Sequence, residues 1–426
     1  MKLRYCVLVL SILLLSFSGF AAGHSAGELA GQAASADAAA STAAIRELRS
    51  MGYAGLDAIL AKYAAEIENF SKTANADENW KRIANAIDTV AMQKDAYTSQ
   101  LYWYTDIEEA RRAARAENKP ILTLRLLGNL NEEFSCANSR LFRTVLYSDP
   151  KISKYLRENY ILHWRSVRPA PRITIDFGDG RKIERTITGN SIHYIIDADA
   201  NVIDAIPGLY GPDSFLGYLM RANGSYRSAR ILPPEQKTLA YMKHRKMGFD
   251  QIIKERAQAI AKSGVKPAEP KAGTIAILAA PMAMSKAIIV DEYSILRVFD
   301  DFAKYEPVLD LDDWTKLGKA FAPDNSLSPN SVSLIRRQNL KTGLSEDEFK
   351  GMLARLETFV SIDTTRNEFL FHGKLYEWLN RTPNADLEEL NARVYDQMFK
   401  TPNSDKWLGL YSSDIYTALD GNGIIK

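Results

Sequence analysis

The residue with the clearest capacity for chemistry is Cys136, in the stretch SCANSRLFR over residues 135–143. At the start of a helix, a cysteine faces unpaired backbone N–H groups and the positive end of the helix dipole, and both favour its thiolate form. Arg140 and Arg143 share that helical face. We therefore expect Cys136 to be a nucleophile, with Arg140 stabilising the thiolate and Ser139 donating a hydrogen bond to it. The alternative is that Cys136 is a small apolar residue in a packed helix, where free cysteines are usually inert.

The chain begins with a segment typical of a secretory signal peptide, because Lys2 and Arg4 precede an apolar run that ends in small residues. The apolar run covers residues 6–20, which is shorter than the roughly 20 residues that a helix needs to cross a membrane. We expect an exported protein, periplasmic or secreted, without a stable membrane span. Cleavage of the signal would remove Cys6 and leave Cys136 as the lone cysteine, which rules out an internal disulfide and permits a disulfide-linked dimer.

The composition points to a globular chain with more than one domain. The chain has 426 residues, of which 46% are hydrophobic, and this is enough for a sizeable core. The balance of 54 basic against 52 acidic residues gives a formal charge of +2. That balance lacks the basic excess of nucleic-acid-binding proteins, so we expect no nucleic-acid partner.

The elements around Cys136 alternate between helix and strand patterns. The expected order is helix, strand, helix, strand, hairpin, strand, strand and helix, over residues 106–117, 121–127, 136–156, 160–164, 172–187, 192–197, 202–206 and 212–220. His163 and His193 lie in two of these strands and would approach each other only if those strands were neighbours. With no further ligands at a suitable spacing, we expect no metal there.

This order, with a cysteine between the first central strand and a helix, resembles the thioredoxin superfamily over about residues 102–222. Trp103, the helix EEARRAARAENKP and the strand ILTLRLL are similar to the family's approach to its active site. The stretch HYIIDADANVIDAIPGLYGPDSFLGYL is similar to its final hairpin and helix, with Gly208 near the usual glycine. On this alignment Cys136 takes the position of the first cysteine of the Cys-x-x-Cys motif and Ser139 that of the second, giving a Cys-x-x-Ser site.

Two positions beside the expected thiol depart from the family pattern. Ser191 stands where family members carry a cis-proline facing the sulfur, and Phe134 and Ser135 replace the tryptophan that commonly precedes the first cysteine. We therefore include Ser191 and Phe134 as candidate binding residues beside Cys136.

The resemblance implies monothiol chemistry without a cofactor. Without a resolving thiol, Cys136 could attack a disulfide but would need a second thiol for release, such as glutathione or a substrate cysteine. We expect thiol–disulfide exchange or redox sensing on exported proteins that carry thiols or disulfides. The competing hypothesis is a non-catalytic thioredoxin-fold scaffold whose helical C-terminal half binds a protein partner. Exposure of the Cys136 thiol discriminates the two.

A second candidate surface lies in the C-terminal half, in the stretch IDTTRNEFLFHGKLYEWL. Glu368 and His372 are one helical turn apart, and a hydrogen bond between them at the surface is expected. Two ligands fall short of the three or four that a metal site requires, so we expect no metal. The members of this surface are Asp363, Arg366, Asn367, Glu368 and His372. A hydrolase ranks last, because the chain has no Gly-x-Ser-x-Gly motif.

The sequence thus predicts an α/β thioredoxin-like domain, with a central mixed sheet flanked by helices and an inserted β-hairpin, and a mainly α-helical C-terminal domain. The expected divisions are a signal peptide (1–22), an Ala/Ser-rich tether (23–44) with order beginning near Ile45, an N-terminal helical segment (45–100), the thioredoxin-like domain (101–222), a basic helix and linker (223–272) and the α-helical domain (273–426).

Overall fold

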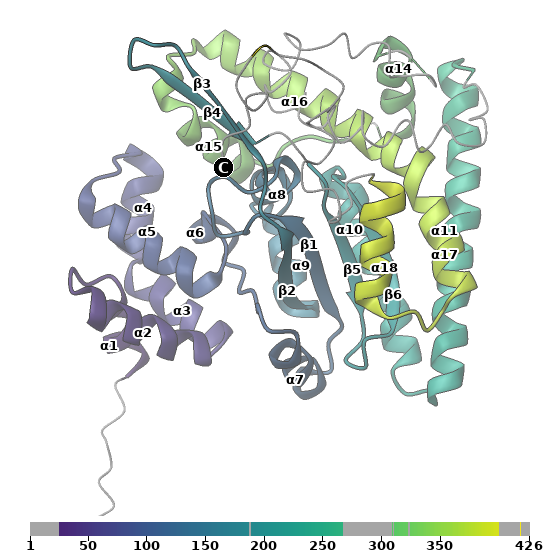
Figure 1. The fold of residues 1–426 in the computed structure, drawn as a ribbon, viewed down its shortest axis with the longest axis horizontal. Coiled ribbons are helices and arrows are strands. Elements are labelled where there is room, and N and C mark those ends of the chain that lie inside the picture. The colour runs from purple at the N-terminus through teal and green to yellow at the C-terminus, as the bar shows by residue number, and fades with distance from the viewer. Residues whose placement is uncertain are drawn as a thin grey trace, which may run out of the picture.

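The computed structural model describes residues 25–186, 189–266, 309, 311–322, 324–399 and 418. The expected signal peptide and residues 267–272 of the expected linker lie outside the described residues. So do residues 274–290, a stretch of mostly apolar sequence at the start of the expected α-helical domain. The described chain is a mixed α/β structure in which a central sheet lies between N-terminal helices on one side and long C-terminal helices on the other (Figure 1). This confirms the mixed α/β class.

The central sheet has four strands in the order β2-β1-β5-β6. The strands are β1 (Ile121–Leu127), β2 (Ile161–Arg168), β5 (Ile192–Ile196) and β6 (Val202–Pro207). β1 pairs with β2 in parallel and with β5 antiparallel, and β6 is antiparallel to β5. Every residue of β1, β5 and β6 is buried, because helices cover both faces of the sheet. Their nearly continuous apolar sequences follow from this double cover.

The two strand histidines do not meet, because β1 separates β2 from β5. His163 lies opposite Thr123 and His193 opposite Leu124. Neighbouring residues of a strand point to opposite faces, so the two imidazoles lie on opposite faces of the sheet.

The expected hairpin forms a separate two-stranded sheet, β3 (Arg172–Asp176) and β4 (Lys182–Thr186), in which Ile175 lies opposite Ile183. Its turn contains Gly178 and Gly180, whose φ angles of 75° and 92° suit glycine. The hairpin extends away from the body of the protein (Figure 1).

Several helices adjoin the sheet, and two of them start at a side-chain cap. The adjoining helices are α7 (Ile107–Glu117), α8 (Ala137–Leu141), the π-helix η1 (Phe142–Leu146), α9 (Pro150–Asn159) and α10 (Pro212–Ala229). Asp106 caps α7 by accepting a hydrogen bond from the Glu109 N–H, and Asp149 caps α9. Phe142 of η1 and Phe215 of α10 pack against His193, which places both elements on the same face of the sheet.

Residues 25–102 form a helical unit with its own hydrophobic cluster. It contains α1 (Ala26–Ala33), α2 (Ala38–Ser50), α3 (Tyr53–Lys62), α4 (Ala64–Thr73), α5 (Glu78–Ala91) and α6 (Ala96–Ser99). The prediction of a tether over 23–44 is wrong, because Ser25 and Glu28 form a capping box that starts α1 and Leu29 is buried. Small side chains here allow close packing. At Gly55 a Cβ atom would collide with the carbonyl of Leu48.

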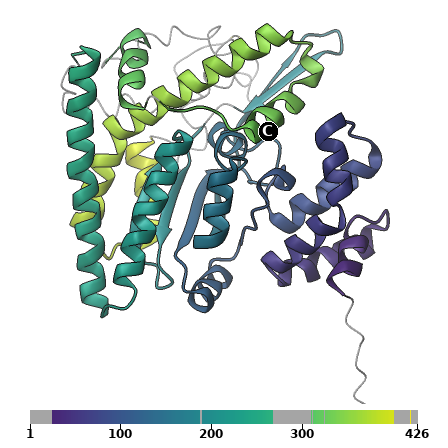
Figure 2. The ribbon, with the colours of Figure 1, turned by 180° about the vertical axis from the view of Figure 1, so that it is seen from behind.

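The C-terminal half is helical in its described parts, as expected. Its elements are α11 (Pro234–Ser263), α14 (Leu311–Phe321), α15 (Pro329–Gln338), η3 (Leu340–Thr342), α16 (Glu346–Arg366), η4 (Asn367–His372), α17 (Gly373–Arg381), α18 (Leu387–Arg393) and η5 (Val394–Met398). One hydrophobic cluster includes buried residues from Leu101 to Phe399, so these helices share a core with the sheet. Figure 2 shows α11 standing along the outer side of α10. None of the helices in the described ranges has the length and apolar character needed to cross a bilayer.

Candidate functional site

The structure brings Cys136, Ser139 and Ser191 together. Cys136 is the N-cap residue of α8, and its N–H donates to the carbonyl of Leu127 at the end of β1 (3.0 Å). Its Sγ lies 3.1 Å from the Ser191 Oγ and 3.4 Å from the Ser139 Oγ. The side chain is fully buried, with an exposed fraction of 0%. The expected neighbours of the sulfur are therefore present, but solvent does not reach it.

Ser139 has a hydrogen-bonding role that differs from the expected one. Its hydroxyl donates to the carbonyl of Cys136 (2.8 Å) and accepts from the thiol. A hydroxyl has a single proton, so this geometry uses it on the backbone instead of on the sulfur.

The arginines of this helix hold neighbouring loops. Arg140 donates to the Thr186 hydroxyl at the end of β4 (2.8 Å). Arg143 is buried and donates to the carbonyls of Leu130 and Glu132 (3.2 and 2.7 Å), and burial lowers the pKa of its guanidinium. Arg143 therefore fixes the loop that leads from β1 to Cys136.

Phe134, the other candidate binding residue, lies half-buried in this loop. The guanidinium of Arg172, from β3, lies over its ring at 4.6 Å from the centroid. This contact connects the loop before Cys136 to the base of the hairpin.

The C-terminal helices cover the thiol. Glu388, Asn391 and Tyr395 lie on one face of the continuous segment α18–η5. The Tyr395 hydroxyl donates to the carbonyl of Asn190 (3.1 Å), and Asn190 immediately precedes Ser191. Asn391 accepts from the Tyr194 hydroxyl of β5 at 3.3 Å. This segment thus closes over the sheet beside Cys136.

A buried arginine anchors the same segment to the central strand. Arg125 of β1 donates to Glu388 (2.7 Å) and to the Thr123 hydroxyl, which also lies 2.7 Å from the Nδ1 of His163. Arg165 approaches Glu388 from β2 at 3.3 Å. Because a buried guanidinium is costly without partners, these bonds hold α18 on the sheet.

Neither strand histidine is available as a base near neutral pH. Burial, with the charges of Arg125 and Arg165 adding to it, lowers the pKa of His163 to about 3. Burial lowers the pKa of His193 to about 3, and its Nε2 lies 2.6 Å from the Tyr147 hydroxyl. Both imidazoles are therefore neutral.

The second predicted surface is in the interior. All five of its members are at least nine-tenths buried: Asp363, Arg366, Asn367, Glu368 and His372. The prediction of an exposed site is wrong, because the end of α16 and the whole of η4, residues 360–372, are buried without a break. Asn367, for example, donates to the carbonyl of Leu209 (2.7 Å), beside the end of β6.

His372 instead belongs to a buried ionic cluster that reaches the sheet. Its Nδ1 lies 2.8 Å from Glu368 Oε1, and its Nε2 lies 3.8 Å from Asp204 Oδ1. Asp204 also binds the Nε2 of His244, from α11, at 2.8 Å. In the described ranges, no group of three or more His, Cys, Asp or Glu side chains is placed to hold a metal ion.

The charges of this cluster stabilise one another. Burial alone would lower the pKa of His372, but Glu368 and Asp204 outweigh burial and raise it to about 9. Burial would raise the pKa of Asp204, but hydrogen bonds from His244 and His372 hold it well below its usual range. Sequence reasoning missed Asp204 and His244. The available signal was a carboxylate in the fully buried strand VIDAIP, since such a group requires a partner.

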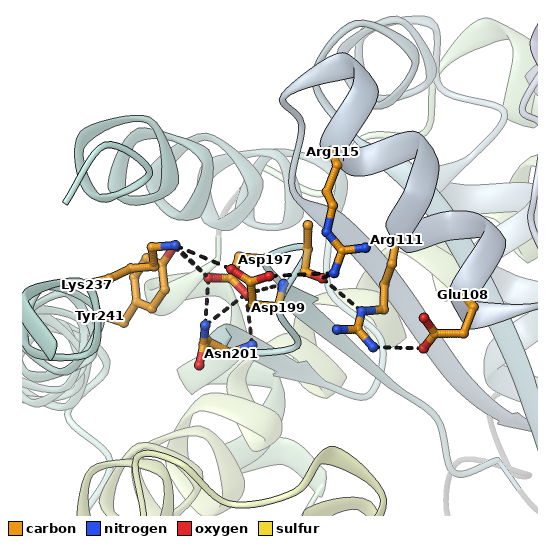
Figure 3. A network of polar contacts seen from close by, with 9 residues as sticks. Glu108, Arg111, Arg115, Asp197, Asp199, Asn201, Lys237 and Tyr241 are labelled. Carbon is orange, nitrogen blue, oxygen red and sulfur yellow. Dashed lines mark hydrogen bonds and ion pairs between the residues drawn. The ribbon is translucent and has the colours of Figure 1, made fainter. Parts of the chain in front are cut away.

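A third polar cluster clamps the turn between β5 and β6 (Figure 3). Arg111 and Arg115, from α7, both donate to the carbonyl of Ala198 (2.8 and 2.9 Å). Asp197 accepts from the backbone N–H groups of Asp199 and Asn201, each at 2.9 Å. A hollow of about 540 Å³ adjoins this turn. Because its polar groups serve the turn and α7, we interpret this cluster as structural.

Comparison with known proteins adds no relative. No protein family model matches this chain, no curated protein matches it, and no solved structure matches it.

Proposed function

We propose that this chain is an exported, non-catalytic scaffold with thioredoxin-like topology, whose helical C-terminal half binds a protein partner. One observation carries the proposal: the Cys136 thiol is fully buried beneath α18–η5. Thiol–disulfide exchange requires a thiolate to reach the sulfur of another molecule, and buried structural cysteines do not.

The sheet and the placement of Cys136 support the thioredoxin-like part of the proposal. The cysteine follows the central strand β1 and begins a helix, and the position expected to face the sulfur is occupied by Ser191 at 3.1 Å. The strand order is β2-β1-β5-β6, with β1 parallel to β2 and β5 antiparallel to both of its neighbours, and this arrangement is compatible with the resemblance.

The outward face of α11 is the surface that we propose for a partner. It exposes three large apolar side chains, Leu239, Met247 and Ile253, which are 63%, 63% and 46% exposed. The opposite face of α11 buries Tyr241 and Ile252 against the core. The exposed Lys243, Lys246 and Asp250 lie among these apolar side chains, and a face that combines apolar and charged groups suits a protein contact.

The test is the alkylation rate of Cys136 in the signal-free protein, with Cys136→Ser as the blank. We expect the rate to rise with urea in parallel with unfolding and to be negligible in native buffer. Rapid alkylation of the native protein, with a pH midpoint below the about 8.5 of a free thiol, would contradict the scaffold proposal.

That opposite result would support the second candidate, monothiol exchange through Cys136. The observation in its favour is that two hydroxyls, of Ser139 and Ser191, lie within 3.4 Å of the sulfur. Hydroxyls so placed can reorient to donate to a thiolate once α18–η5 moves aside.

A further inference from the structure

A hollow of about 350 Å³ lies where α4, α5 and α6 meet the loop between β1 and Cys136. Its volume lies in the range of about 300–1,000 Å³ that is usual for small-molecule sites. Apart from two alanines, every side chain that lines it is either aromatic or able to form hydrogen bonds. A lining without any aliphatic leucine, isoleucine or valine is unusual for an apolar ligand and suits a polar one.

One wall of the hollow is a fixed aromatic corner. Phe70 stacks on Trp80 with centroids 4.1 Å apart, and Tyr97 meets Trp80 nearly at a right angle at 5.2 Å. Arg337, from α15, lies over the rings of Phe70 and Tyr97 at 5.8 and 5.6 Å. The protein's own guanidinium thus already takes the cation–π position of this corner, which disfavours a cationic ligand.

The charges that line the hollow are nearly balanced. The ammonium of Lys94 pairs with Glu133 at 3.3 Å, and Lys81 adds a second cation. Asp88 and Asp95 add two carboxylates, which also interact with the buried Arg143. Neither an anion nor a cation is therefore strongly attracted, and a neutral ligand is favoured.

Two amides on different sides of the hollow remain available for a ligand. The side chain of Asn85, on α5, makes no hydrogen bond within the described ranges. Among the residues that the structure describes, the side chain of Asn131, on the loop, reaches only the sulfur of Met92, at 3.9 Å. Each amide offers both donors and an acceptor. Burial and Asp95 raise the pKa of Asp88 to about 7, so its carboxyl can also donate or accept near neutral pH.

We propose that this hollow binds a neutral saccharide. Sugar rings combine apolar C–H faces, which pack against aromatic rings, with hydroxyl groups that both donate and accept hydrogen bonds. Phe70, which is half-buried, and the small exposed parts of Trp80 and Tyr97, which are 7% and 6% exposed, supply the first kind of contact. Asn85, Asn131 and Asp88 supply the second. This site is separate from the Cys136 region and does not depend on the scaffold proposal.

The first experiment is ligand-observed NMR on the signal-free full chain, followed by calorimetric titration of any sugar that binds. The probes are glucose, galactose, mannose, N-acetylglucosamine, maltose and cellobiose, with tetramethylammonium and inorganic phosphate for comparison. We expect at least one sugar to bind at millimolar or lower concentration. Binding of none of the sugars, or tighter binding of tetramethylammonium or phosphate, would overturn the proposal.

Two variants locate the binding. Asn85→Leu should weaken sugar binding about tenfold, because it removes hydrogen bonds and places an apolar group in the hollow. Asn69→Leu is the matched control, since Asn69 is exposed on α4 and does not line the hollow. Equal affinities of the two variants would show that the sugar binds elsewhere and would overturn the proposal.

Lysine acetylation provides a second readout that needs no variant. Lys81 and Lys94 line the hollow, whereas Lys72 is exposed on α4 outside it. A saturating sugar should slow acetylation of Lys81 and Lys94 several-fold and leave Lys72 unchanged. Unchanged rates at all three lysines would contradict binding in the hollow.

Discussion

The Cys136 region and the N-terminal hollow both place polar groups beside aromatic rings, but they differ in access. The Cys136 sulfur is fully buried, and the Tyr395 hydroxyl of η5 donates to the backbone carbonyl of Asn190 beside it. The hollow is open, and the amide of Asn85 in its lining is exposed to solvent. Cys136, which stands out in the sequence, is thus buried. The hollow is open to solvent, although its residues belong to no recognisable sequence motif.

The difference shows what the buried polar groups of the larger core do. Arg125, Asp204 and His372 each link a C-terminal helix to the central sheet or to its neighbours. These side chains use their hydrogen-bond donors and acceptors within the protein, so few remain for a ligand. Changes in this core should therefore alter stability, whereas changes in the hollow should alter binding with little loss of stability.

The largest effect is expected for Asp204→Ala. The substitution leaves His244 and His372 without their shared carboxylate, and loss of one partner of a buried pair costs about 3–5 kcal/mol. Urea unfolding near neutral pH measures this loss in the free energy of unfolding. Asp199→Ala is the control, because Asp199 lies in the turn that precedes β6. Its carboxylate is 60% exposed, and the ion pairs that it makes in the described ranges are long, at 3.6 Å. Similar losses in both variants would contradict a special role for the buried cluster.

The pH dependence of stability tests the same cluster. The pKa of His372 is raised from 6.5 to about 9, so the folded chain holds this proton more tightly than the unfolded chain. The resulting stabilisation is complete below the unfolded pKa and is lost as pH rises through the folded one. We expect the free energy of unfolding to fall by about 3 kcal/mol across this window.

His372→Gln should flatten this alkaline slope, although it lowers stability at every pH below the folded pKa of His372. The slope, taken from urea unfolding at a series of pH values, separates titration from simple loss of packing. An unchanged slope in the variant would assign the alkaline titration to another group.

Ionisation of Asp88, which lines the hollow, should destabilise the fold, whereas the positive charge of His372 stabilises it. Burial and Asp95 raise the pKa of Asp88 from 3.8 to about 7, so stability falls as pH rises between these values. Asparagine retains an oxygen that can accept from the N–H of Ala96. Asp88→Asn should therefore be more stable than the natural chain by about 4 kcal/mol above neutral pH, with no gain near pH 4. A variant that is less stable at both pH values would show that the carboxylate is needed for folding.

The strand and helix order could be predicted because local patterns encode it. The continuous apolar sequences of β1 and β5 and the glycine turn of the hairpin are visible without a structure. The helix α1 and the first half of α2, up to Ala44, were missed because alanine is compatible with a flexible chain and with a packed helix. An alanine-rich segment forms a packed helix only where other helices cover it, as they cover Ala30 and Ala44.

The meeting of Cys136 with Ser139 and Ser191 could be predicted from the alignment, but its burial could not. The cover comes from Tyr395, more than two hundred residues away in the chain, and no local pattern encodes such a contact. The same reason explains the error at Glu368 and His372. Their spacing correctly predicts a hydrogen bond, but the spacing of one helix cannot show that Asp204 lies beyond it.

The smallest effect is expected for Tyr395→Phe, and it tests how the thiol is sealed. The variant loses one buried hydrogen bond, to the carbonyl of Asn190, at a cost of about 1 kcal/mol. If α18–η5 opens locally, Cys136 alkylation in native buffer should accelerate about fivefold, because the open population rises by that factor.

Tyr155→Phe is the matched control for this measurement. The Tyr155 hydroxyl accepts a hydrogen bond from Asn223 at 3.1 Å, remote from α18–η5, and its loss should cost a similar free energy of unfolding. Acceleration in Tyr395→Phe alone would mean that the thiol is reached by local opening of the C-terminal cover. Equal acceleration in both variants would mean that Cys136 is reached only by global unfolding. Access to the thiol would then require loss of the whole fold, whereas the hollow is open in the folded protein.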